Sequence, residues 1–247
     1  VDADTVSVSN LSRQILHTTS TVNVNKAKSA AIAVERLNPH CRIIPVPEFA
    51  DAVKLKALVK NADVILDCTD NLATRIAVSR AAHDAGKPLV FASAVRFSGQ
   101  LTVFDPSVPE SPCFECIFEE DDPGNDVKAA AVGVFSSVTG IVGTLQATEA
   151  LKIAAGIGST LCGRMLFIDA LNMQFDTIRV KRRKGCRRFF QCLRNSNFQW
   201  PDTGKTGRRQ GGRDTVRNLE GENHEKKISG MLGRGRGGES LKTGERI

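Results

Sequence analysis

The run ADVILDCTDN, residues 62–71, decides the fold of this chain. Its apolar part predicts a short buried strand over 62–68. Residues 71–85 have the composition of a helix that ends at Gly86, and a second apolar strand is expected over 88–92. Continuous apolar strands separated by amphipathic helices are typical of a parallel sheet that is covered on both faces.

The same alternation extends upstream of this run. Residues 25–37 predict a helix, because apolar residues recur there at helical spacing before a break at Asn38-Pro39. Residues 42–46 form a short β-rich run, and residues 52–60 predict another helix. The upstream part therefore continues the pattern of alternating strands and helices.

Downstream the pattern changes. Residues 96–104 look extended, residues 105–126 are rich in Pro, Asp and Glu and predict a loop, and residues 134–155 predict a long, mostly apolar helix. Two late strands are expected, over 165–170 and 175–180. We therefore expect an α/β fold, with a Rossmann-like, mostly parallel sheet, helices on both faces and an antiparallel extension.

Residues 187–247 differ in composition from the rest. They hold 14 Lys and Arg against 7 Asp and Glu, and 11 of the 21 glycines. This excess accounts for the whole net charge of +7, so residues 1–186 are neutral. A segment without periodic apolar residues cannot offset its chain entropy. We expect one folded domain over 1–186 and a disordered Gly/Arg-rich tail over 187–247, for which a solvated state is favoured over RNA binding.

Composition also limits the class of protein. No apolar run approaches the roughly 20 residues that span a bilayer, and residues 1–10 lack the basic segment of a signal peptide. Seven cysteines without a secretory segment indicate a reducing compartment, where paired cysteines more often hold a metal than form disulfides. We expect a cytoplasmic protein with neither a membrane nor a nucleic-acid partner.

The first group of candidate site residues lies near the start of the chain: Asp2, Asn10, Arg13 and Lys26. An acid at the end of a buried strand is the usual partner of a ribose hydroxyl in nucleotide-binding sheets. Arg and Lys after it could neutralise a triphosphate. Each residue alone is more simply an ordinary surface group, but together, beside a parallel sheet, they favour nucleotide binding.

The second group directly follows the strand over 62–68. Asp70 lies where the carboxyl end of a parallel strand meets a ligand, and it could hold Mg²⁺ against phosphates. The alternative is that Asp70 caps a helix that starts at Asn71, an equally good use of an Asp in that place. The residues alone leave both interpretations open.

The third group is a Cys-x2-Cys pair, Cys113 and Cys116, in the predicted acidic loop. A redox role would require the pair at a helix start after a strand, which the loop composition does not suggest. Half of a structural zinc site fits better. Candidates for the second half are Cys186 and Cys192, although Cys-x5-Cys is looser than the normal spacing.

Four motifs occur in order: DADTVSVSNLSRQ with Lys26, DCTDN followed by Arg75, CFEC, and GVFSSVTGIVGTLQATEALK. Together they closely resemble the MoeB/ThiF/HesA family, bacterial relatives of ubiquitin-activating enzymes, over about residues 1–186. The chain is most similar to the molybdopterin-synthase adenylyltransferase branch, with the thiamine-pathway branch close behind.

The resemblance implies an adenylation reaction. The C-terminal Gly-Gly carboxylate of a ubiquitin-like sulfur-carrier protein, of the MoaD or ThiS type, attacks the α-phosphate of ATP and gives an acyl-adenylate and pyrophosphate. It also implies Mg²⁺, Zn²⁺ and a homodimer. By motif match, Asp2 would bind the ribose, and the phosphates would be contacted by Asn10, Arg13 and Lys26. Asp70, beside Asn71, would orient Mg²⁺ and the reacting phosphate. The zinc would be bound by Cys113, Cys116 and Cys186. Arg13 and Asp70 are the catalytic candidates.

The sequence departs from the family pattern in three places. The chain begins inside the second strand of the nucleotide fold, without the Gly-x-Gly-x-x-Gly loop, so we expect weak ATP binding or none. Residues 129–131 are alanines where some members carry a cysteine, which leaves adenylation alone. Arg187 follows Cys186 where a closing Cys-x2-Cys pair is expected. Our hypothesis is a reading-frame slip there; the alternatives are a genuine tail or a site that uses Cys192.

Three other functions are alternatives to adenylation of a carrier protein. One is a truncated, catalytically inactive remnant of such an enzyme. Another is an enzyme like the tRNA threonylcarbamoyladenosine dehydratases, which the SNLSRQ and CFEC motifs fit less well. A nicotinamide oxidoreductase would share the sheet but would not need Arg13, Lys26 and Asp70 around a triphosphate.

Overall fold

A computed structural model describes residues 1–118 and 132–186. These residues belong to one compact unit of the chain, Val1–Gly207. The expected disordered tail, Cys192 and the alanines at 129–131 lie outside the described residues. No helix in the described part is long and apolar enough to cross a membrane.

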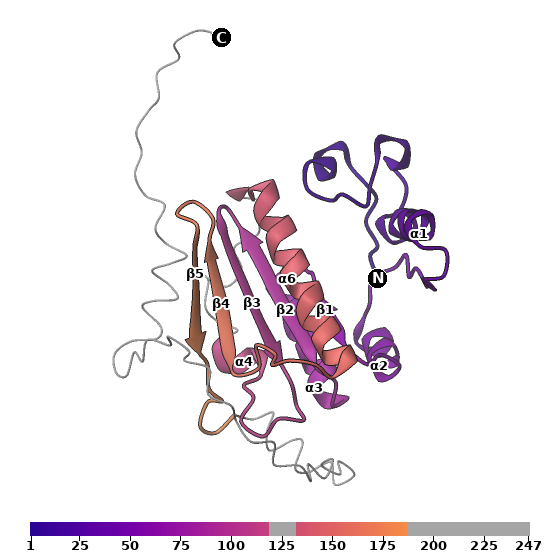
Figure 1. Ribbon diagram of the computed structural model, residues 1–247. Helices are drawn as coiled ribbons and strands as arrows, with labels where there is room; N and C mark the ends of the chain where they lie inside the picture. The colour runs from indigo at the N-terminus through magenta and orange to yellow at the C-terminus, as the bar shows by residue number, and fades with distance from the viewer. Residues whose placement is uncertain (119–131, 187–247) are drawn as a thin grey trace, which may run out of the picture. The chain divides into compact units, whose positions relative to one another are not determined.

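Most strands and helices follow the order expected from the sequence (Figure 1). The helical elements are the 3-10 turns η1 (Val8–Ser12) and η2 (Thr19–Thr21) and the α-helices α1 (Lys26–Leu37), α2 (Ala52–Lys60), α3 (Leu72–Asp84), α4 (Phe114–Ile117) and α6 (Ser136–Ala155). The strands are β1 (Ile65–Asp67), β2 (Leu89–Val95), β3 (Ser98–Phe104), β4 (Arg164–Asp169) and β5 (Gln174–Arg179).

The described strands form one mixed sheet in the order β1-β2-β3-β4-β5. β1 and β2 are parallel, with Asp67 opposite Phe91. The pairs β2–β3, β3–β4 and β4–β5 are antiparallel. The expected α/β fold with an antiparallel extension is therefore confirmed, and the parallel part of the described sheet is the β1–β2 pair.

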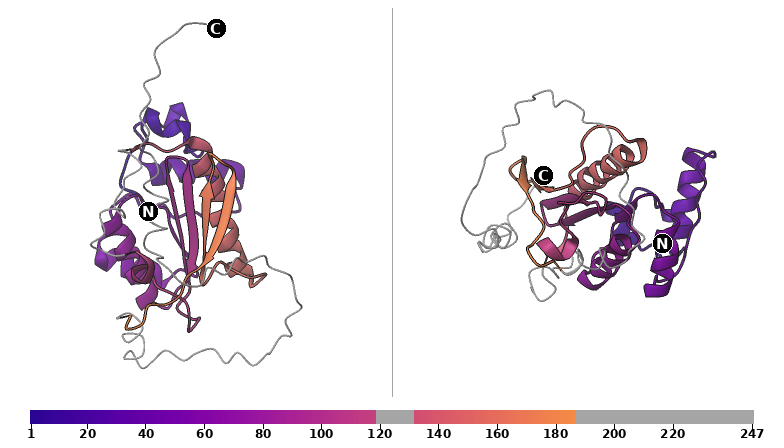
Figure 2. Two further views of the ribbon diagram at one scale, coloured as in Figure 1. Left: turned by 90° about the vertical axis from the view of Figure 1, so that its left-hand side faces the viewer. Right: turned by 90° about the horizontal axis from the view of Figure 1, so that it is seen from below.

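Both faces of this sheet are covered, because most side chains of the central strands β2 and β3 are buried, whichever face they point to (Figure 2). On one face, Val138 and Val142 of α6 pack against Val90, Leu101 and Ile168 of the sheet. α3 and α4 lie on the opposite face (Figure 2). Alternate side chains of one strand thus belong to two different layers of the core.

The layer on the α3 and α4 side is aromatic. Phe91 and Phe104 of the sheet contact Phe114 of α4, with ring centroids 5.4 and 6.1 Å apart, and Phe118 stacks on Phe114 at 4.6 Å. Aromatic pairs at such distances stabilise beyond the area that they bury. This cluster fixes the short helix α4, which carries Cys116, against the sheet.

A close approach of α6 to β3 explains one glycine. A Cβ atom added to Gly99 would lie 2.5 Å from Cγ2 of Val142. The absence of a side chain therefore lets α6 lie directly on the sheet. At its C-terminus α6 ends at Gly156, whose φ of 64° is the left-handed conformation that favours glycine.

Two expectations from the sequence are corrected. Residues 42–46 form no strand, because a strand requires a ladder of backbone hydrogen bonds and only one, from Asp2 N–H to the Val46 carbonyl (3.1 Å), reaches this segment in the described structure. The predicted loop over 105–126 contains the helix α4, with Cys113 as its N-cap residue.

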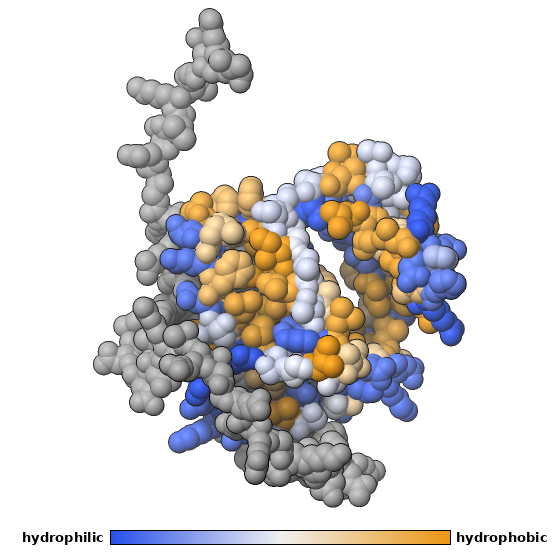
Figure 3. All heavy atoms as spheres, in the orientation of Figure 1, coloured by the Kyte–Doolittle hydropathy of each residue, from blue (hydrophilic) through white to orange (hydrophobic). Residues whose placement is uncertain are grey.

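At the sheet edge, β5 is exposed at most positions. Leu171 and Met173 of the preceding turn and Phe175 of β5 are exposed apolar side chains. Figure 3 is viewed from the side on which α6 lies, and in it apolar residues gather over α6 and the strands beside it. Isolated exposed apolar residues are common in soluble proteins, so this edge alone assigns no role.

Candidate nucleotide site and cysteine cluster

A buried acid stands at the carboxyl end of β1. Asp67 is 1% exposed, and its Oδ1 atom accepts hydrogen bonds from Thr69 N (2.9 Å) and Thr69 Oγ1 (2.7 Å). Its Oδ2 atom is buried without a hydrogen-bond partner in the described structure. Burial raises the pKa of Asp67, although the hydrogen bonds from Thr69 and the charge of Arg75 act in the opposite direction.

Arg75 anchors the loop that follows Asp67. Its Nε and Nη2 atoms donate to the Thr69 carbonyl at 3.2 and 2.9 Å, and Nη2 also donates to Ser93 Oγ of β2 at 3.2 Å. The guanidinium lies 5.4 Å from the centre of the Phe91 ring. The arginine therefore ties the loop between β1 and α3 to the neighbouring strand.

The structure decides which residue caps α3. Asn71 is the N-cap, since its Oδ1 atom accepts a hydrogen bond from Thr74 N at 2.9 Å. Asp70 is exposed and has no hydrogen bond or ion pair with any described residue. The capping alternative for Asp70 is therefore wrong; Asp70 is an exposed residue whose neighbours, Thr69 and Asn71, are held by hydrogen bonds.

Two residues of the first group of candidates, Asp2 and Lys26, lie in one network near the start of α1. Asp2 Oδ1 accepts from Asp4 N at 2.9 Å, and Lys26 Nζ donates to Asp4 Oδ2 at 2.9 Å. Burial and the charge of Lys26 lower the pKa of His17, whose Nδ1 atom lies 2.9 Å from Ser29 Oγ. Asp2 and Lys26 thus lie in one network, with Asp4 between them.

Asn10 and Arg13 have local structural roles. Asn10 is buried in η1, and its Oδ1 atom accepts from Ser7 N at 3.1 Å. Arg13 is half-buried and donates from Nη1 to the Ser9 carbonyl at 3.1 Å. Neither residue is joined to Asp2 or Lys26 by a hydrogen bond within the described residues, and no such bond links this group to Asp70.

Three predicted zinc ligands come together. Cys113 Sγ lies 3.6 Å from Cys116 Sγ and 3.6 Å from Cys186 Sγ, and all three sulfur atoms lie within 4.8 Å of one another. Tetrahedral zinc with Zn–S bonds of about 2.3 Å separates its sulfur ligands by roughly 3.8 Å. The spacing therefore fits three corners of a zinc tetrahedron, and Cys192 lies outside the described residues.

The cysteine cluster also favours a thiolate. A hydrogen bond from Cys113 lowers the pKa of Cys116 to about 5, and the reciprocal interaction and burial raise the pKa of Cys113. Because the thiolate is the form that binds metals, this environment suits a cation. The helical position of the Cys-x2-Cys pair differs from the expected loop, but the third cysteine distinguishes it from a simple redox pair.

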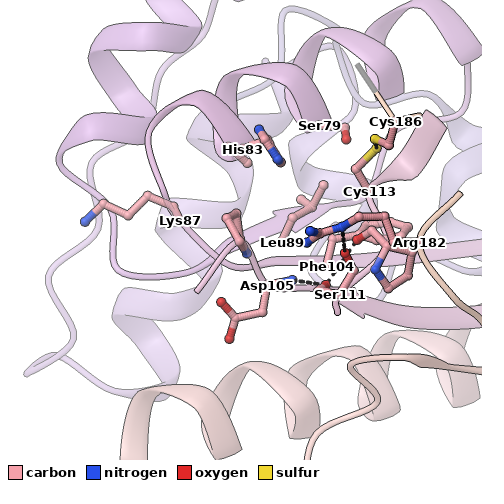
Figure 4. Close-up of a pocket in the computed structure, with 13 residues that line it drawn as sticks. Ser79, His83, Lys87, Leu89, Phe104, Asp105, Ser111, Cys113, Arg182 and Cys186 are labelled. Atoms are coloured by element: carbon pink, nitrogen blue, oxygen red, sulfur yellow. Dashed lines mark hydrogen bonds between the residues drawn. The ribbon is translucent and has the colours of Figure 1, made fainter. Parts of the chain in front are cut away.

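A pocket beside this cluster is lined by residues of α3, β2, the loop after β3, and the segment after β5 (Figure 4). Arg182 Nε donates to the Ser111 carbonyl at 3.0 Å, and Asp105 N donates to Ser111 Oγ at 3.0 Å. Cys113 and Cys186 are also among the residues that line it. The segment that carries Arg182 and Cys186 is therefore attached to the loop after β3 by the hydrogen bond from Arg182 and by the cysteine cluster.

Sequence reasoning assigned no role to several residues of these networks. They are Asp4, Asn25, Asp67, Thr69, Arg75 and Gln146. Gln146 could have been found as a lone amide within the apolar helix predicted over 134–155. The other contacts depend on which loops meet, which the sequence pattern does not specify.

Comparison with known proteins shows the family of this chain. The profile of the ThiF family matches residues 1–188. The chain belongs to the ThiF family. It is 44% identical over 185 residues to the adenylyltransferase and sulfurtransferase MOCS3 of Bos taurus, which covers 74% of this chain and 40% of that protein. It is 41% identical over 189 residues to the molybdopterin-synthase adenylyltransferase of Escherichia coli K12, which covers 75% of this chain and 74% of that protein.

Solved structures show the same fold. The structure of E. coli MccB with ATP aligns with a TM-score of 0.65 at 18% identity, and covers 76% of this chain and 58% of that one. The structure of PaaA aligns with a TM-score of 0.59 at 19% identity, and covers 73% of this chain and 55% of that one. The ThiF-family chain thus spans about two fifths of the MOCS3 proteins and about three fifths of the MccB structure that it matches.

Proposed function

We propose that this chain takes part in ATP-dependent adenylation of the C-terminal Gly-Gly carboxylate of a ubiquitin-like sulfur-carrier protein, in molybdenum-cofactor or thiamine biosynthesis. Membership of the ThiF family and similarity to named adenylyltransferases support the reaction class. The observation that carries the proposal is the exposed carboxylate of Asp70, whose neighbours Thr69 and Asn71 are hydrogen-bonded, in the loop at the carboxyl end of a parallel strand.

In the proposed reaction a carrier carboxylate oxygen bonds to the α-phosphorus of ATP and the bond to the β-phosphate bridging oxygen breaks. The products are an acyl-adenylate and pyrophosphate. Asp2 accepts a hydrogen bond from a ribose hydroxyl, and the positive charges of Lys26 and Arg13 offset the negative charge of the phosphates. Asp70 supplies a carboxylate for Mg²⁺, which neutralises charge on the transferring phosphate when bound. Asn10 and Asn71 act by fixing the loops that carry these charged groups.

Lys26 must be released from Asp4 to contact a phosphate. Its side chain is 17% exposed, whereas that of Asp4 is 62% exposed. A surface ion pair of this kind contributes little stability, so a triphosphate can replace the carboxylate at small cost. Asp4 therefore holds the ammonium close to Asp2 until the nucleotide arrives.

The cysteine cluster has a structural role in this proposal. Cys113, Cys116 and Cys186 hold Zn²⁺ and join α4 to the segment after β5, with Cys192 as the candidate fourth ligand. Closed cysteine-rich zinc sites generally stabilise a fold and do not take part in catalysis. The active protein is proposed to be a cytoplasmic homodimer.

The test is carrier-dependent exchange of labelled pyrophosphate into ATP. At ATP concentrations high enough to compensate for the weak binding expected from the sequence, we expect exchange with a Gly-Gly-ended carrier and none with a carrier that lacks its last Gly. Asp70→Asn is expected to lower kcat by at least about 100-fold, in line with the loss of one charged group from a transition-state site. Exchange that required tRNA in place of the carrier would favour the dehydratase alternative, and no exchange with either would favour an inactive remnant.

A further inference from the structure

Asn25 joins two segments that are far apart in the sequence. Its Nδ2 atom donates to the Asp2 carbonyl at 2.8 Å and to the Asp4 carbonyl at 3.1 Å. Its Oδ1 atom accepts from Lys28 N at 3.2 Å and so caps α1. One amide therefore fastens the chain around residues 2–4 to the first turn of a helix.

The two segments carry the ribose and phosphate candidates. Asp2 lies on the first segment, and Lys26 directly follows Asn25 on the helix. Lys26 N donates to the Asp4 carbonyl at 2.8 Å, which adds a backbone contact beside the side-chain clamp. The distance between Asp2 and Lys26 is thus set by contacts at Asn25 and its neighbour.

Capping alone would not require an asparagine. An N-cap needs only an acceptor, which Ser, Thr or Asp supplies as well. Asp51 caps α2 in this way through one hydrogen bond from Lys54 N at 2.8 Å. Asn25 differs from such caps in its amide nitrogen, which donates hydrogen bonds to two carbonyl oxygens. A hydroxyl has only one hydrogen to donate and a carboxylate has none, so neither could form both bonds.

We propose that Asn25 is a positioning residue, which holds Asp2 and Lys26 at the spacing that the ribose and phosphates of one nucleotide require. The inference rests on the proposed function, and it deepens that function by naming a residue that need not touch the nucleotide. Preorganised groups bind more tightly, since less ordering remains to be done on binding.

The test compares Asn25→Ser with Asp51→Ser. Both variants keep a side-chain cap acceptor, but only Asn25→Ser removes the two amide donors. We expect Asn25→Ser to raise the KM for ATP in the carrier-dependent exchange by roughly tenfold, as the loss of two ordinary hydrogen bonds implies. The kcat at saturating ATP should change by less than about twofold, because the groups at the reacting phosphate are retained.

Hydrogen exchange measured by mass spectrometry gives a second readout without nucleotide. Amides in residues 1–6 of Asn25→Ser should exchange about tenfold faster than in the wild-type chain, and those of Asp51→Ser should not change. Asn25→Asp, which places a carboxylate oxygen against two carbonyls, should have at least the same effect.

The outcomes separate the two proposals. Wild-type exchange activity with an unchanged KM in Asn25→Ser would overturn the positioning role alone. Equal increases in KM for Asn25→Ser and Asp51→Ser would also overturn it, since a general loss of stability would then explain both. No carrier-dependent exchange by the wild-type chain would overturn the proposed function, and this inference with it.

Discussion

At the scale of single residues, the β1–α3 loop is organised around a carboxyl group that is not the proposed catalytic one. Asp67 is buried and accepts two hydrogen bonds from Thr69, while Asp70 is exposed. The two acids of the DCTD run therefore differ in role. Asp67 stabilises the loop through its hydrogen bonds, and Asp70 lies exposed on that loop.

The buried carboxyl should make stability depend on pH. Because burial raises the pKa of Asp67 above its ordinary value of 3.8, the folded state binds a proton that the unfolded state has lost, and stability falls as pH rises through this interval. Asp67→Asn should remove this dependence and become more stable than wild type as pH increases. Urea unfolding at several pH values measures it, and a difference independent of pH would contradict the assignment.

The hydroxyl of Thr69 can be tested separately from its backbone. Thr69→Val removes the Oγ1 donor to Asp67 and keeps the shape, so we expect kcat for exchange to fall about fivefold to tenfold with a stability loss of about 1 kcal/mol. Thr69→Ser keeps the hydroxyl and should behave as wild type. If valine and serine gave the same kcat, the hydroxyl would have no part in positioning Asp70.

At the scale of elements, the helices follow from short-range signals in the sequence. Asn25 and Asp51 cap α1 and α2, and Gly156 ends α6. Such signals act within a few residues and can be read directly. The β-rich run over 42–46 and the loop expected over 105–126 could not be judged in this way, because pairing and aromatic packing depend on distant segments.

The same limit explains the outcome at the candidate site. The DCTDN motif predicts a site in the loop between β1 and α3, but the sequence alone left two roles open for Asp70, a ligand of Mg²⁺ or the cap of α3. Only the geometry assigns the cap to Asn71. Likewise the sequence allowed Cys186 to be proposed as a partner of Cys113 and Cys116. That their sulfur atoms lie close together could be seen only in the folded structure.

The amide of Gln146 connects α6 to two strands. Its Nε2 atom donates to the carbonyls of Asp67 and Val90, both at 2.9 Å, and the side chain is buried. Gln146→Leu should cost about 2–3 kcal/mol, because it leaves two buried acceptors without this donor. Thr148→Ala, on the exposed face of α6, should stay within about 0.5 kcal/mol of wild type. Chemical denaturation compares them, and equal losses would show that α6 is held by apolar packing alone.

At the scale of the whole molecule, the cysteine cluster connects segments that lie 73 residues apart in the sequence, at Cys113 and Cys186. Cys113 and Cys116 stand at α4, and Cys186 follows β5. Arg183 Nη2 also donates to the Glu115 carbonyl at 3.0 Å. Binding of one metal at this point would therefore stabilise the tertiary arrangement of the sheet extension.

Zinc content measures this connection directly. We expect about one zinc per wild-type chain, loss of the metal in Cys113→Ser, and a lower melting temperature for that variant, since metal-binding free energy adds to folding free energy. Cys41→Ser replaces an exposed cysteine outside the cluster and should keep both the metal and the melting temperature. A metal-free wild-type chain with the same melting temperature as Cys113→Ser would exclude a structural zinc site.

The fourth ligand distinguishes the hypotheses about residues after Cys186. Three thiolates complete a zinc tetrahedron only with one more donor, and Cys192 is the cysteine that follows. If Cys192 is that donor, Cys192→Ser should weaken zinc binding by at least about tenfold in a chelator competition, as loss of a charged ligand implies. That result would count against a reading-frame slip, because a segment read in the wrong frame has no reason to supply a ligand. Unchanged affinity would leave a three-cysteine site completed by water, and would favour the slip.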